Sequence, residues 1–152
     1  MSQRPVVAVF NGPNLNLLGE RQPEVYGSGT LADLRELCRA TTEAHGWDLD
    51  FRQTNHEGVL LEAIHEIRHT AYGLVLNAAA WTHTSVAIHD ALALVRCPVV
   101  EVHLSDVHAR EAFRHHSYVT PRAALVIVGR GAQGYVDAIE ALPGLRSDPG
   151  TG

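Results

Sequence analysis

Apolar residues in this sequence gather in five short runs, separated by segments whose apolar positions have a helical spacing. A short apolar run bounded by turn residues is typical of a buried strand. The first run, for example, ends at Asn11-Gly12-Pro13, a strong turn signal. The pattern therefore predicts five strands, at residues 6–10, 49–51, 73–77, 98–104 and 124–128.

Four helices are predicted around these strands. The first begins at Thr30, because Asp33 three residues later completes the pattern of a capping box, and it closes at His45-Gly46. Apolar residues at a helical spacing stripe the other three. These stripes are Leu60, Ile64 and Ile67; Ile88, Ala91, Leu92 and Val95; and Ala132, Tyr135, Val136 and Ile139. Residues 105–122 are largely polar and predict a loop with a helical turn.

The alternation of strands and helices defines the expected fold. Strands too apolar to leave one face in water are typical of a parallel sheet covered on both sides. We therefore expect an α/β fold, a flavodoxin-like doubly wound five-stranded parallel sheet in the order 2-1-3-4-5, with helices on both faces. At 152 residues, the chain has the length of one domain. The expected domain spans residues 1–145, and residues 146–152 are expected to form a disordered tail.

This strand order also predicts where a ligand binds. In such sheets, ligands occupy a crevice outside the carboxyl ends of the strands, near the switch point between strands 1 and 3. The segments that leave strands 1, 3 and 4 are residues 11–16, 77–83 and 103–105. The crevice is therefore expected to hold amide side chains, His83, His103 and Ser105, with Arg21 and Tyr26 above it on the first loop.

Composition excludes several classes of protein. The net charge of −5 and the pI near 6.0 argue against a nucleic-acid binder, which needs a basic face. No apolar run approaches ~20 residues and the N-terminus lacks the layout of a signal peptide, so neither membrane insertion nor secretion is expected. Cys38 and Cys97 alone form no disulfide framework, which indicates a reduced, cytoplasmic protein.

The chain contains no lysine, since all 12 basic residues are arginine. This absence excludes Schiff-base and pyridoxal chemistry, which need a lysine amine, and the P-loop, which needs its own lysine. The ten histidines are the opposite bias, and histidine is the side chain that titrates near neutral pH. The composition indicates acid–base chemistry without a covalent amine.

Two short motifs invite functions that their positions do not favour. His65-Glu66-Ile67-Arg68-His69 matches the zinc-binding pattern H-E-x-x-H, but its helix ends away from the crevice and no third ligand is near in sequence. Residues 129–134 match G-x-G-x-x-G, yet no further strand follows to complete a dinucleotide site. We interpret the first as a solvated helix face, and the second as glycines that permit a tight turn and close helix–strand packing.

Three longer motifs lie at the predicted crevice. The first is NGPNLNLLG at residues 11–19, followed by Arg21, Pro23 and Tyr26-Gly27. The second contains Asn77, THTS at residues 82–85, and Asp90. The third is EVHLSDVHARE at residues 101–111, followed by FR at 113–114 and HS at 116–117. Together they closely resemble the type II 3-dehydroquinate dehydratase (type II dehydroquinase) family, over residues 5–142.

The resemblance implies an activity and a mode of assembly. Members of this family dehydrate 3-dehydroquinate to 3-dehydroshikimate on a flavodoxin-like fold, without metal or cofactor, and typically assemble as a dodecamer of four trimers. The same reaction serves the shikimate pathway, which leads to chorismate, and the breakdown of quinate, so the resemblance leaves the pathway open. The resemblance thus implies 3-dehydroquinate as the small-molecule substrate and a homododecamer (tetramer of trimers) as the assembly.

The resemblance also assigns the catalytic roles of a trans-dehydration through an enolate. Tyr26 is the implied base and Arg21 the cation that helps to ionise it, because removing the proton near pH 7 requires a shift of about 3 pKa units, or ~4 kcal/mol. Asn14 resembles the residue that holds a water against the enolate oxygen. His103 resembles the general acid. Glu101 lies two positions earlier on the same strand face, so its carboxylate can orient the imidazole.

Substrate contacts are implied in the same way. Asn77, His83 and Arg114 correspond to residues that bind the substrate hydroxyls. The backbone N–H groups of Leu104 and Ser105, with the Ser105 hydroxyl, correspond to the site of the substrate carboxylate.

Three further positions qualify this assignment. Asp90 corresponds to a residue that reaches the site from a neighbouring subunit. Arg110 lies in the third motif, and the sequence leaves open whether it serves the site or pairs with Glu111 or Asp106. After Asn77 the family often has proline or glycine and a tyrosine, whereas this chain has AAAW at residues 78–81, which puts the local turn and the substrate fit in question.

Two alternatives to a lyase stay open. One is a non-catalytic flavodoxin-like module that binds small anions in the same crevice. The presence of Arg21, Tyr26 and His103 argues against it, because a pure binder needs neither a base nor an acid. The other is a small zinc hydrolase built on His65 and His69, which predicts stoichiometric metal and sensitivity to EDTA.

Overall fold

The fold is a five-stranded parallel sheet in a computed structural model that describes residues 3–20, 24 and 29–146. The strands are β1 (Val6–Asn11), β2 (Asp48–Gln53), β3 (Gly73–Asn77), β4 (Val99–His103) and β5 (Leu125–Val128). Every adjacent pair is parallel, and the order is β2-β1-β3-β4-β5. The predicted doubly wound, flavodoxin-like sheet is confirmed.

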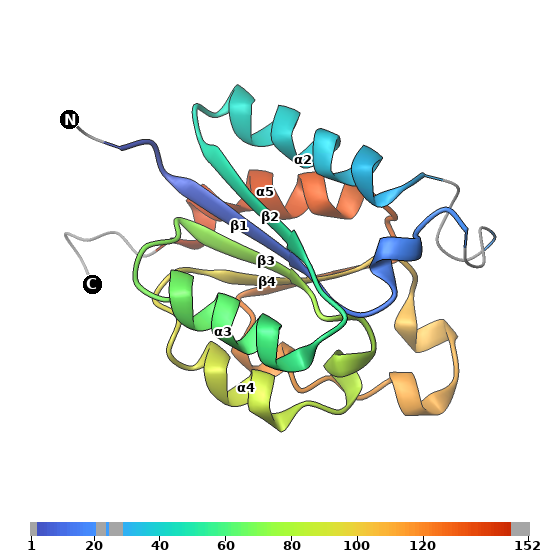
Figure 1. Ribbon diagram of the computed structural model, residues 1–152. Helices are drawn as coiled ribbons and strands as arrows, with labels where there is room; N and C mark the ends of the chain where they lie inside the picture. The colour runs from blue at the N-terminus through green and yellow to red at the C-terminus, as the bar shows by residue number, and fades with distance from the viewer. Residues whose placement is uncertain (1–2, 21–23, 25–28, 147–152) are drawn as a thin grey trace.

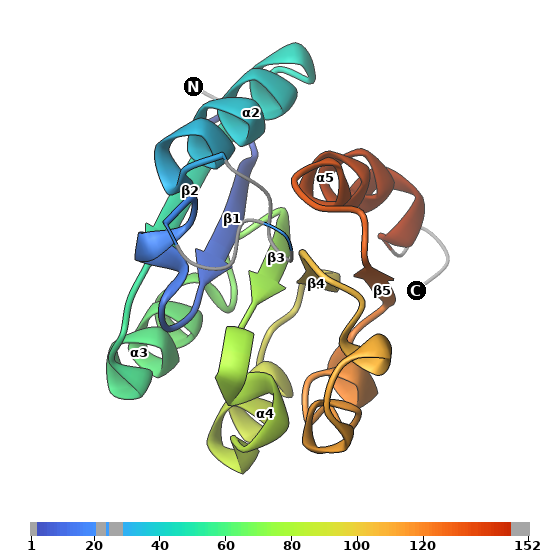
Figure 2. The same cartoon turned by 90° about the vertical axis from the view of Figure 1, so that its right-hand side faces the viewer.

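Helices cover both faces of the sheet. Helices α2 (Leu31–Ala44) and α5 (Gln133–Leu145) pack on one face, and α3 (Glu57–Ile67) and α4 (Val86–Leu92) pack on the other (Figures 1 and 2). The capping box predicted at the start of the first helix is present, since Thr30 and Asp33 exchange side-chain to backbone hydrogen bonds of 3.1 and 3.0 Å. Each face has its own apolar cluster against the sheet.

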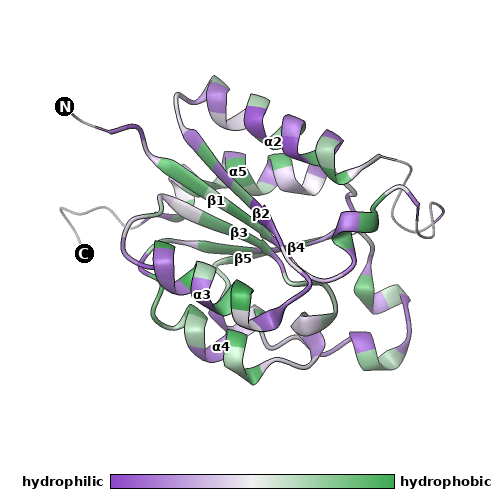
Figure 3. Ribbon diagram, in the orientation of Figure 1, coloured by the Kyte–Doolittle hydropathy of each residue, from purple (hydrophilic) through white to green (hydrophobic). Residues whose placement is uncertain are grey.

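Burial differs between the middle and the edges of the sheet. All residues of β3 and β4 are buried, whereas β2 and β5 consist mainly of partly exposed residues because each edge strand has one neighbour. Hydropathy colouring shows hydrophobic residues along the central strands and alternating hydrophilic and hydrophobic residues along α2 and α3 (Figure 3). Within the described residues, no helix is both long and apolar enough to cross a bilayer.

The structure corrects three boundaries. Helix α4 ends at Leu92, so Val95 packs against the core from the turn that follows. The predicted single helical turn within residues 105–122 is three short 3-10 helices, at Val107–Ala109, Ala112–Arg114 and Thr120–Arg122. Arg146, the first residue of the predicted tail, lies over the Tyr72 ring at 4.1 Å and donates a hydrogen bond to its carbonyl oxygen. Residues 147–152 lie outside the described part of the chain.

Candidate active site

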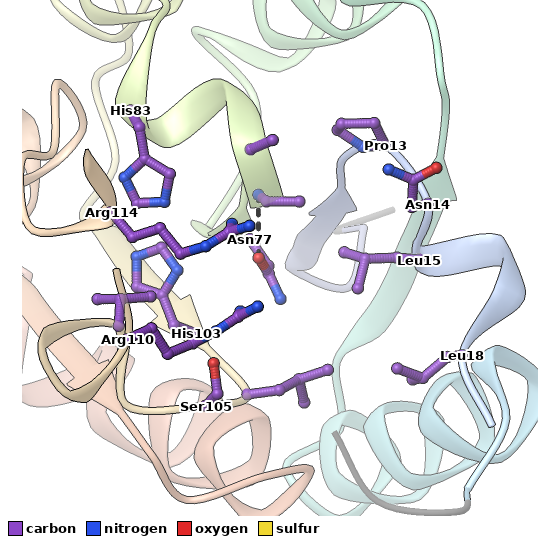
Figure 4. A pocket seen from close by; sticks show the side chains of 14 residues that line it. Pro13, Asn14, Leu15, Leu18, Asn77, His83, His103, Ser105, Arg110 and Arg114 are labelled. Carbon is purple, nitrogen blue, oxygen red and sulfur yellow. Dashed lines mark hydrogen bonds between the residues drawn. The ribbon is translucent and has the colours of Figure 1, made fainter. Parts of the chain in front are cut away.

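A crevice opens at the carboxyl ends of β1, β3 and β4, where the strand order predicts it. In Figure 4, the segment after β1 forms one wall, and the histidine and arginine side chains form the other, with Asn77 between them. The lining residues are Pro13, Asn14, Leu15, Leu18, Asn77, Ala79, Ala80, His83, His103, Leu104, Ser105, Val107, Arg110 and Arg114.

The segments after β1 and β3 are held in direct contact. The Gly12 N–H donates a 2.8 Å hydrogen bond to the Asn77 carbonyl oxygen. A Cβ atom at Gly12 would lie 2.4 Å from the Ala78 carbonyl oxygen, so only glycine allows this approach. Ala79 adopts a left-handed conformation with φ 53°, and its N–H donates to Asn77 Oδ1 at 3.1 Å, the dashed line in Figure 4. The turn therefore fixes the Asn77 amide.

A buried histidine–carboxylate pair lies at the end of β4. His103 and Glu101 are 5% and 2% exposed, and His103 Nε2 lies 2.5 Å from Glu101 Oε2. Ser117 donates to the same oxygen at 2.8 Å, and Thr120 donates to Oε1 at 2.5 Å. Burial alone would raise the pKa of Glu101, but the hydrogen bonds from these three side chains outweigh it and lower the pKa. The carboxylate is therefore held ionised beside the imidazole.

His103 lines two cavities. It lines the crevice together with His83 and Arg114, and the same three residues also line a second cavity. Glu101 lines only that second cavity, with Ser117 and other residues of the 105–122 segment. The imidazole can therefore face a ligand in the crevice while its carboxylate partner stays out of contact with that ligand.

His83 lies parallel to His103, with ring centroids 6.4 Å apart and an interplanar angle of 18°. Its Nδ1 atom hydrogen-bonds with the His116 carbonyl oxygen at 2.8 Å. Burial lowers the pKa of His83, and the nearby charges of His103 and Arg114 lower it further, against the raising effects of the His116 carbonyl and Glu101. The lowered pKa favours a neutral His83 that can exchange hydrogen bonds with a ligand.

Two arginines give the crevice a positive wall. Arg114 Nε lies 2.8 Å from Glu111 Oε2, and Arg110 Nε lies 4.0 Å from Glu111 Oε1. The side chains of Arg114 and Arg110 are 20% and 16% exposed, and both line the crevice. The sequence left open whether Arg110 serves the site or pairs with an acidic neighbour, and in the structure it both lines the crevice and lies near Glu111. A wall of this kind suits an anionic, hydroxyl-bearing ligand.

The remaining predicted site residues are placed unevenly. Asn14 lines the crevice with φ 71°, and its N–H donates to Asn55 Oδ1 at 2.9 Å. Leu104 and Ser105 also line it. Asp90 is exposed on α4 and does not line this crevice. The predicted base Tyr26 and its cation Arg21 lie outside the described residues.

The unusual AAAW segment affects the crevice less than the sequence indicates. Ala79 and Ala80 line the crevice, but Trp81 is not among the lining residues and packs against the apolar cluster beneath α3 and α4. The indole therefore packs outside the crevice, and the part of this segment that lines the crevice consists of small alanine side chains.

The two short motifs take part in ion pairing and in local packing. Glu66 of the H-E-x-x-H match forms hydrogen bonds of 2.9 and 3.2 Å with Arg52, and no group of three or more His, Cys, Asp or Glu side chains suited to a metal ion occurs among the residues that the structure describes. In the glycine motif, Gly129 and Gly131 have φ 74° and 56°. A Cβ atom at Gly134 would lie 3.2 Å from Ile127, so this glycine allows α5 to pack closely on the sheet.

Sequence analysis missed two sets of polar partners. Thr120, which anchors Glu101, comes from a segment without periodicity. Tyr135 occupies an apolar stripe of α5, yet its hydroxyl exchanges hydrogen bonds with Asn11 and Asn77. The sequence did contain one indication of these partners. Periodicity assigns Tyr135 to the core, and a buried hydroxyl needs a hydrogen-bond partner.

Comparison with known proteins gives a consistent result. Residues 5–143 match the family model described as dehydroquinase class II. The chain is 60% identical over 134 residues to 3-dehydroquinate dehydratase 2 of Pseudomonas aeruginosa, covering 88% of this chain and 90% of that protein. It is 57% identical over 140 residues to a 3-dehydroquinate dehydratase of Streptomyces coelicolor, covering 91% and 89%. The crystal structure of type II dehydroquinase from Propionibacterium acnes superposes with a TM-score of 0.88 at 38% identity, covering 93% and 98%.

Proposed function

This chain belongs to the class II dehydroquinase family, and we propose that it is a 3-dehydroquinate dehydratase that converts 3-dehydroquinate into 3-dehydroshikimate and water. The reaction removes a proton from the carbon next to a ketone and expels a hydroxyl group from the following carbon. It therefore needs a base, a group that stabilises the enolate, and a general acid. The observation that carries the proposal is the buried Glu101–His103 pair at the wall of an arginine-lined crevice.

His103 is the proposed general acid. A protonated imidazole donates its proton to the departing hydroxyl, which leaves as water. Glu101 accepts a hydrogen bond from Nε2, so it orients the ring and places a negative charge beside it. Glu101 is a positioning residue in this scheme, since it lines the second cavity and not the crevice.

Tyr26 is the proposed base, and Arg21 the cation that favours its ionised form. Both assignments rest on the sequence motif, since the two residues lie outside the described part of the chain. Leu18, three residues before Arg21 in sequence, lines the crevice, which supports a role for this loop in the site. Asn14, on the same wall, is proposed to hold a water against the enolate oxygen.

The rest of the crevice is proposed to bind the substrate. Asn77, His83 and Arg114 are assigned to its hydroxyl groups, and Leu104 and Ser105 to its carboxylate through backbone N–H groups and the serine hydroxyl. The positive wall supports this assignment, because the substrate is a carboxylate. The proposed reaction proceeds without a covalent intermediate, a metal or another cofactor, and the absence of lysine supports the first of these points.

Assembly is part of the proposal. We propose a homododecamer of four trimers, in which Asp90 contributes to the site of a neighbouring subunit. The exposure of Asp90 on α4, away from the crevice of its own chain, supports this role. Light scattering of the purified protein measures the mass of the assembly. A monomer that turns over substrate at full rate would contradict the shared site. We further propose a cytoplasmic enzyme of chorismate biosynthesis or quinate breakdown, two roles that share the same chemistry.

The test is an assay with purified, EDTA-treated protein and 3-dehydroquinate, which follows the ultraviolet absorbance of the conjugated enone product. We expect product from the wild type and almost none from Tyr26→Phe or from His103→Gln. Substrate binding without turnover by folded wild-type protein would indicate the small-anion-binding module instead. Activity that EDTA abolishes and zinc restores would show that the dehydration needs a metal and would overturn the metal-free scheme. Full activity of Tyr26→Phe would overturn its assignment as the base.

A further inference from the structure

A chain of hydrogen bonds crosses the interior of the protein and ends at the crevice. Asn11 Nδ2 donates to the Arg52 carbonyl oxygen at 3.0 Å, and the Tyr135 hydroxyl donates to Asn11 Oδ1 at 2.7 Å. Asn77 Nδ2 donates to the same hydroxyl at 2.9 Å, and Asn77 Oδ1 accepts from the Ala79 N–H at 3.1 Å. Tyr135 and Asn11 are fully buried and Asn77 is 3% exposed, so water does not compete for these bonds.

The two ends of this chain fix its direction. An asparagine amide can usually be turned over without a visible change in shape, so its orientation has to be inferred from its partners. Here, the Arg52 carbonyl can only accept and the Ala79 N–H can only donate. Asn11 must therefore point its oxygen at Tyr135, which gives its single proton to that oxygen. The tyrosine oxygen is left to accept from Asn77 Nδ2.

The Tyr135 hydroxyl is well suited to this fixed role. Burial raises its pKa well above the usual range for a tyrosine, so the hydroxyl keeps its proton at any working pH. Gly134 lets α5 lie close to the sheet here, since a Cβ atom there would lie 3.2 Å from the Ile127 side chain of β5, which would have to shift slightly. The glycine motif thus brings a polar group of α5 into contact with β1 and β3.

We propose that Tyr135 is a positioning residue that holds Asn77 as a hydrogen-bond donor toward a substrate oxygen in the crevice. The inference rests on the proposed function and names how one of its binding residues works. With one Nδ2 proton given to Tyr135, the second is the donor that Asn77 retains for a ligand. Tyr135 does not line the crevice and acts only through Asn77.

The first test is Tyr135→Phe, which keeps the ring and removes the hydroxyl. We expect kcat/KM for 3-dehydroquinate to fall about 10-fold, mainly through KM, because the Asn77 amide loses the acceptor that orients it. Tyr72→Phe is the matched control, since Tyr72 packs against the same apolar cluster and its hydroxyl is not part of the chain. An unchanged kcat/KM for Tyr135→Phe would overturn the proposal.

A double-mutant cycle separates positioning from general destabilisation. If Tyr135 acts through Asn77, Asn77→Ala and the double variant should have the same kcat/KM. Additive losses would refute the coupling. Asn77→Asp provides a second route that does not depend on Tyr135→Phe folding. The carboxylate still accepts from Ala79 but has no proton to donate, so activity should fall as far as in Asn77→Ala. Retention of activity in Asn77→Asp would show that Asn77 serves as an acceptor.

A measurement without substrate keeps this inference distinct from the proposed function. The side-chain amide resonances of Asn77 can be followed by NMR in free protein. They should shift in Tyr135→Phe and stay in place in Tyr72→Phe. If these shifts are seen but the wild type does not turn over 3-dehydroquinate, the proposed function is rejected, while the inference that Tyr135 orients Asn77 is retained. Unshifted resonances in Tyr135→Phe would reject the orientation itself.

Discussion

Replacing Glu101 by glutamine tests whether the buried charge beside His103, and not only its hydrogen bonds, supports the acid step. The Glu101 side chain is 2% exposed and accepts from three donors. His103 and Ser117 share Oε2, and Thr120 donates to Oε1. Glutamine has almost the same shape. Its carbonyl oxygen can occupy the position of Oε2, and its amide nitrogen can donate to the Thr120 hydroxyl from the position of Oε1.

The expected cost in stability follows from this geometry. In Glu101→Gln the buried His103 and the Ser117 hydroxyl keep their acceptor, and the hydroxyl of the exposed Thr120, which loses its acceptor, can donate to water. The loss is therefore mainly the difference between charge-assisted and neutral hydrogen bonds, partly offset by the easier burial of a neutral amide. We expect the free energy of unfolding at pH 7 to fall by about 1–2 kcal/mol. Glu101→Ala leaves the buried His103 and the partly buried Ser117 hydroxyl without this acceptor, at roughly 1–3 kcal/mol each, while the exposed Thr120 hydroxyl can turn to water. The free energy of unfolding should therefore fall by about 3 kcal/mol.

The effect on activity should be larger than the effect on stability. We expect kcat of Glu101→Gln to fall about 10- to 100-fold, because the protonated imidazole loses its counter-charge. KM should change little, since Glu101 does not line the crevice. The assay combines steady-state kinetics, followed by product absorbance, with urea unfolding of the same preparations.

The chain offers a matched control in a second histidine–glutamate pair. His45 Nε2 lies 2.9 Å from Glu140 Oε2, but these side chains are 29% and 52% exposed. Glu140→Gln should cost less than about 1 kcal/mol and leave kcat unchanged. If Glu101→Gln shows the expected loss of stability but keeps the kcat of the wild type, the charge of Glu101 has no part in the acid step and the reasoning is refuted.

Three further predictions concern the rest of the fold. Ala79→Gly should raise the free energy of unfolding, measured by urea unfolding, by up to ~1 kcal/mol. The left-handed φ of 53° strains alanine by about 1–2 kcal/mol, and the greater freedom of glycine in the unfolded chain offsets part of the gain. A lower midpoint of urea unfolding would contradict this prediction. Burial would raise the pKa of Glu101, but its hydrogen bonds lower the pKa overall, so the ionised carboxylate stabilises the fold above the ordinary value of about 4.3 and this contribution is lost as the pH falls through the lower folded-state value. Between about pH 5 and 2, Glu101→Gln should therefore lose less stability than the wild type. Equal losses would argue against an ionised Glu101 that stabilises the fold. Burial raises the pKa of the Cys38 thiol to about 12. Burial also raises the pKa of the Cys97 thiol, to about 11, against a smaller opposing effect of hydrogen bonding and the Arg146 charge. A thiol-specific disulfide reagent at pH 7 should therefore label both cysteines only after denaturation, and rapid labelling of native protein would show that one of them is accessible as a thiolate.

The sheet could be predicted because its signals are local. β1, β3 and β4 are short apolar runs between turn residues, and their burial matches that pattern. Once the strands alternate with helices, handedness and strand order leave few topologies, and the crevice follows from the topology. Predictions were poorer in residues 105–122, where three short 3-10 helices form through local bonds such as that from His108 N–H to Asp106 and leave no periodic signal.

The site was predicted unevenly for a different reason. His103 and Glu101 alternate on one strand, so their common face can be read from the spacing, and the structure places them 2.5 Å apart. The partners of Tyr135 lie 124 and 58 residues away in sequence, at Asn11 and Asn77. A helical stripe records only that this tyrosine faces the core. Which polar groups meet its hydroxyl depends on how closely α5 approaches the sheet, and this depends on tertiary packing.

Glu101 and Tyr135 have one property in common, which explains why both matter to the site. Each is a polar group at a position that its element otherwise gives to apolar side chains, one within β4 and one on the inner face of α5. A buried polar group destabilises the fold unless it is hydrogen-bonded, so such a position is costly unless its partners are supplied. Here the partners include His103 and Asn77, which line the crevice. Polar residues at core positions therefore indicate which crevice residues are held in one orientation. The buried group determines that orientation, and the crevice residue presents its remaining polar atoms to the ligand.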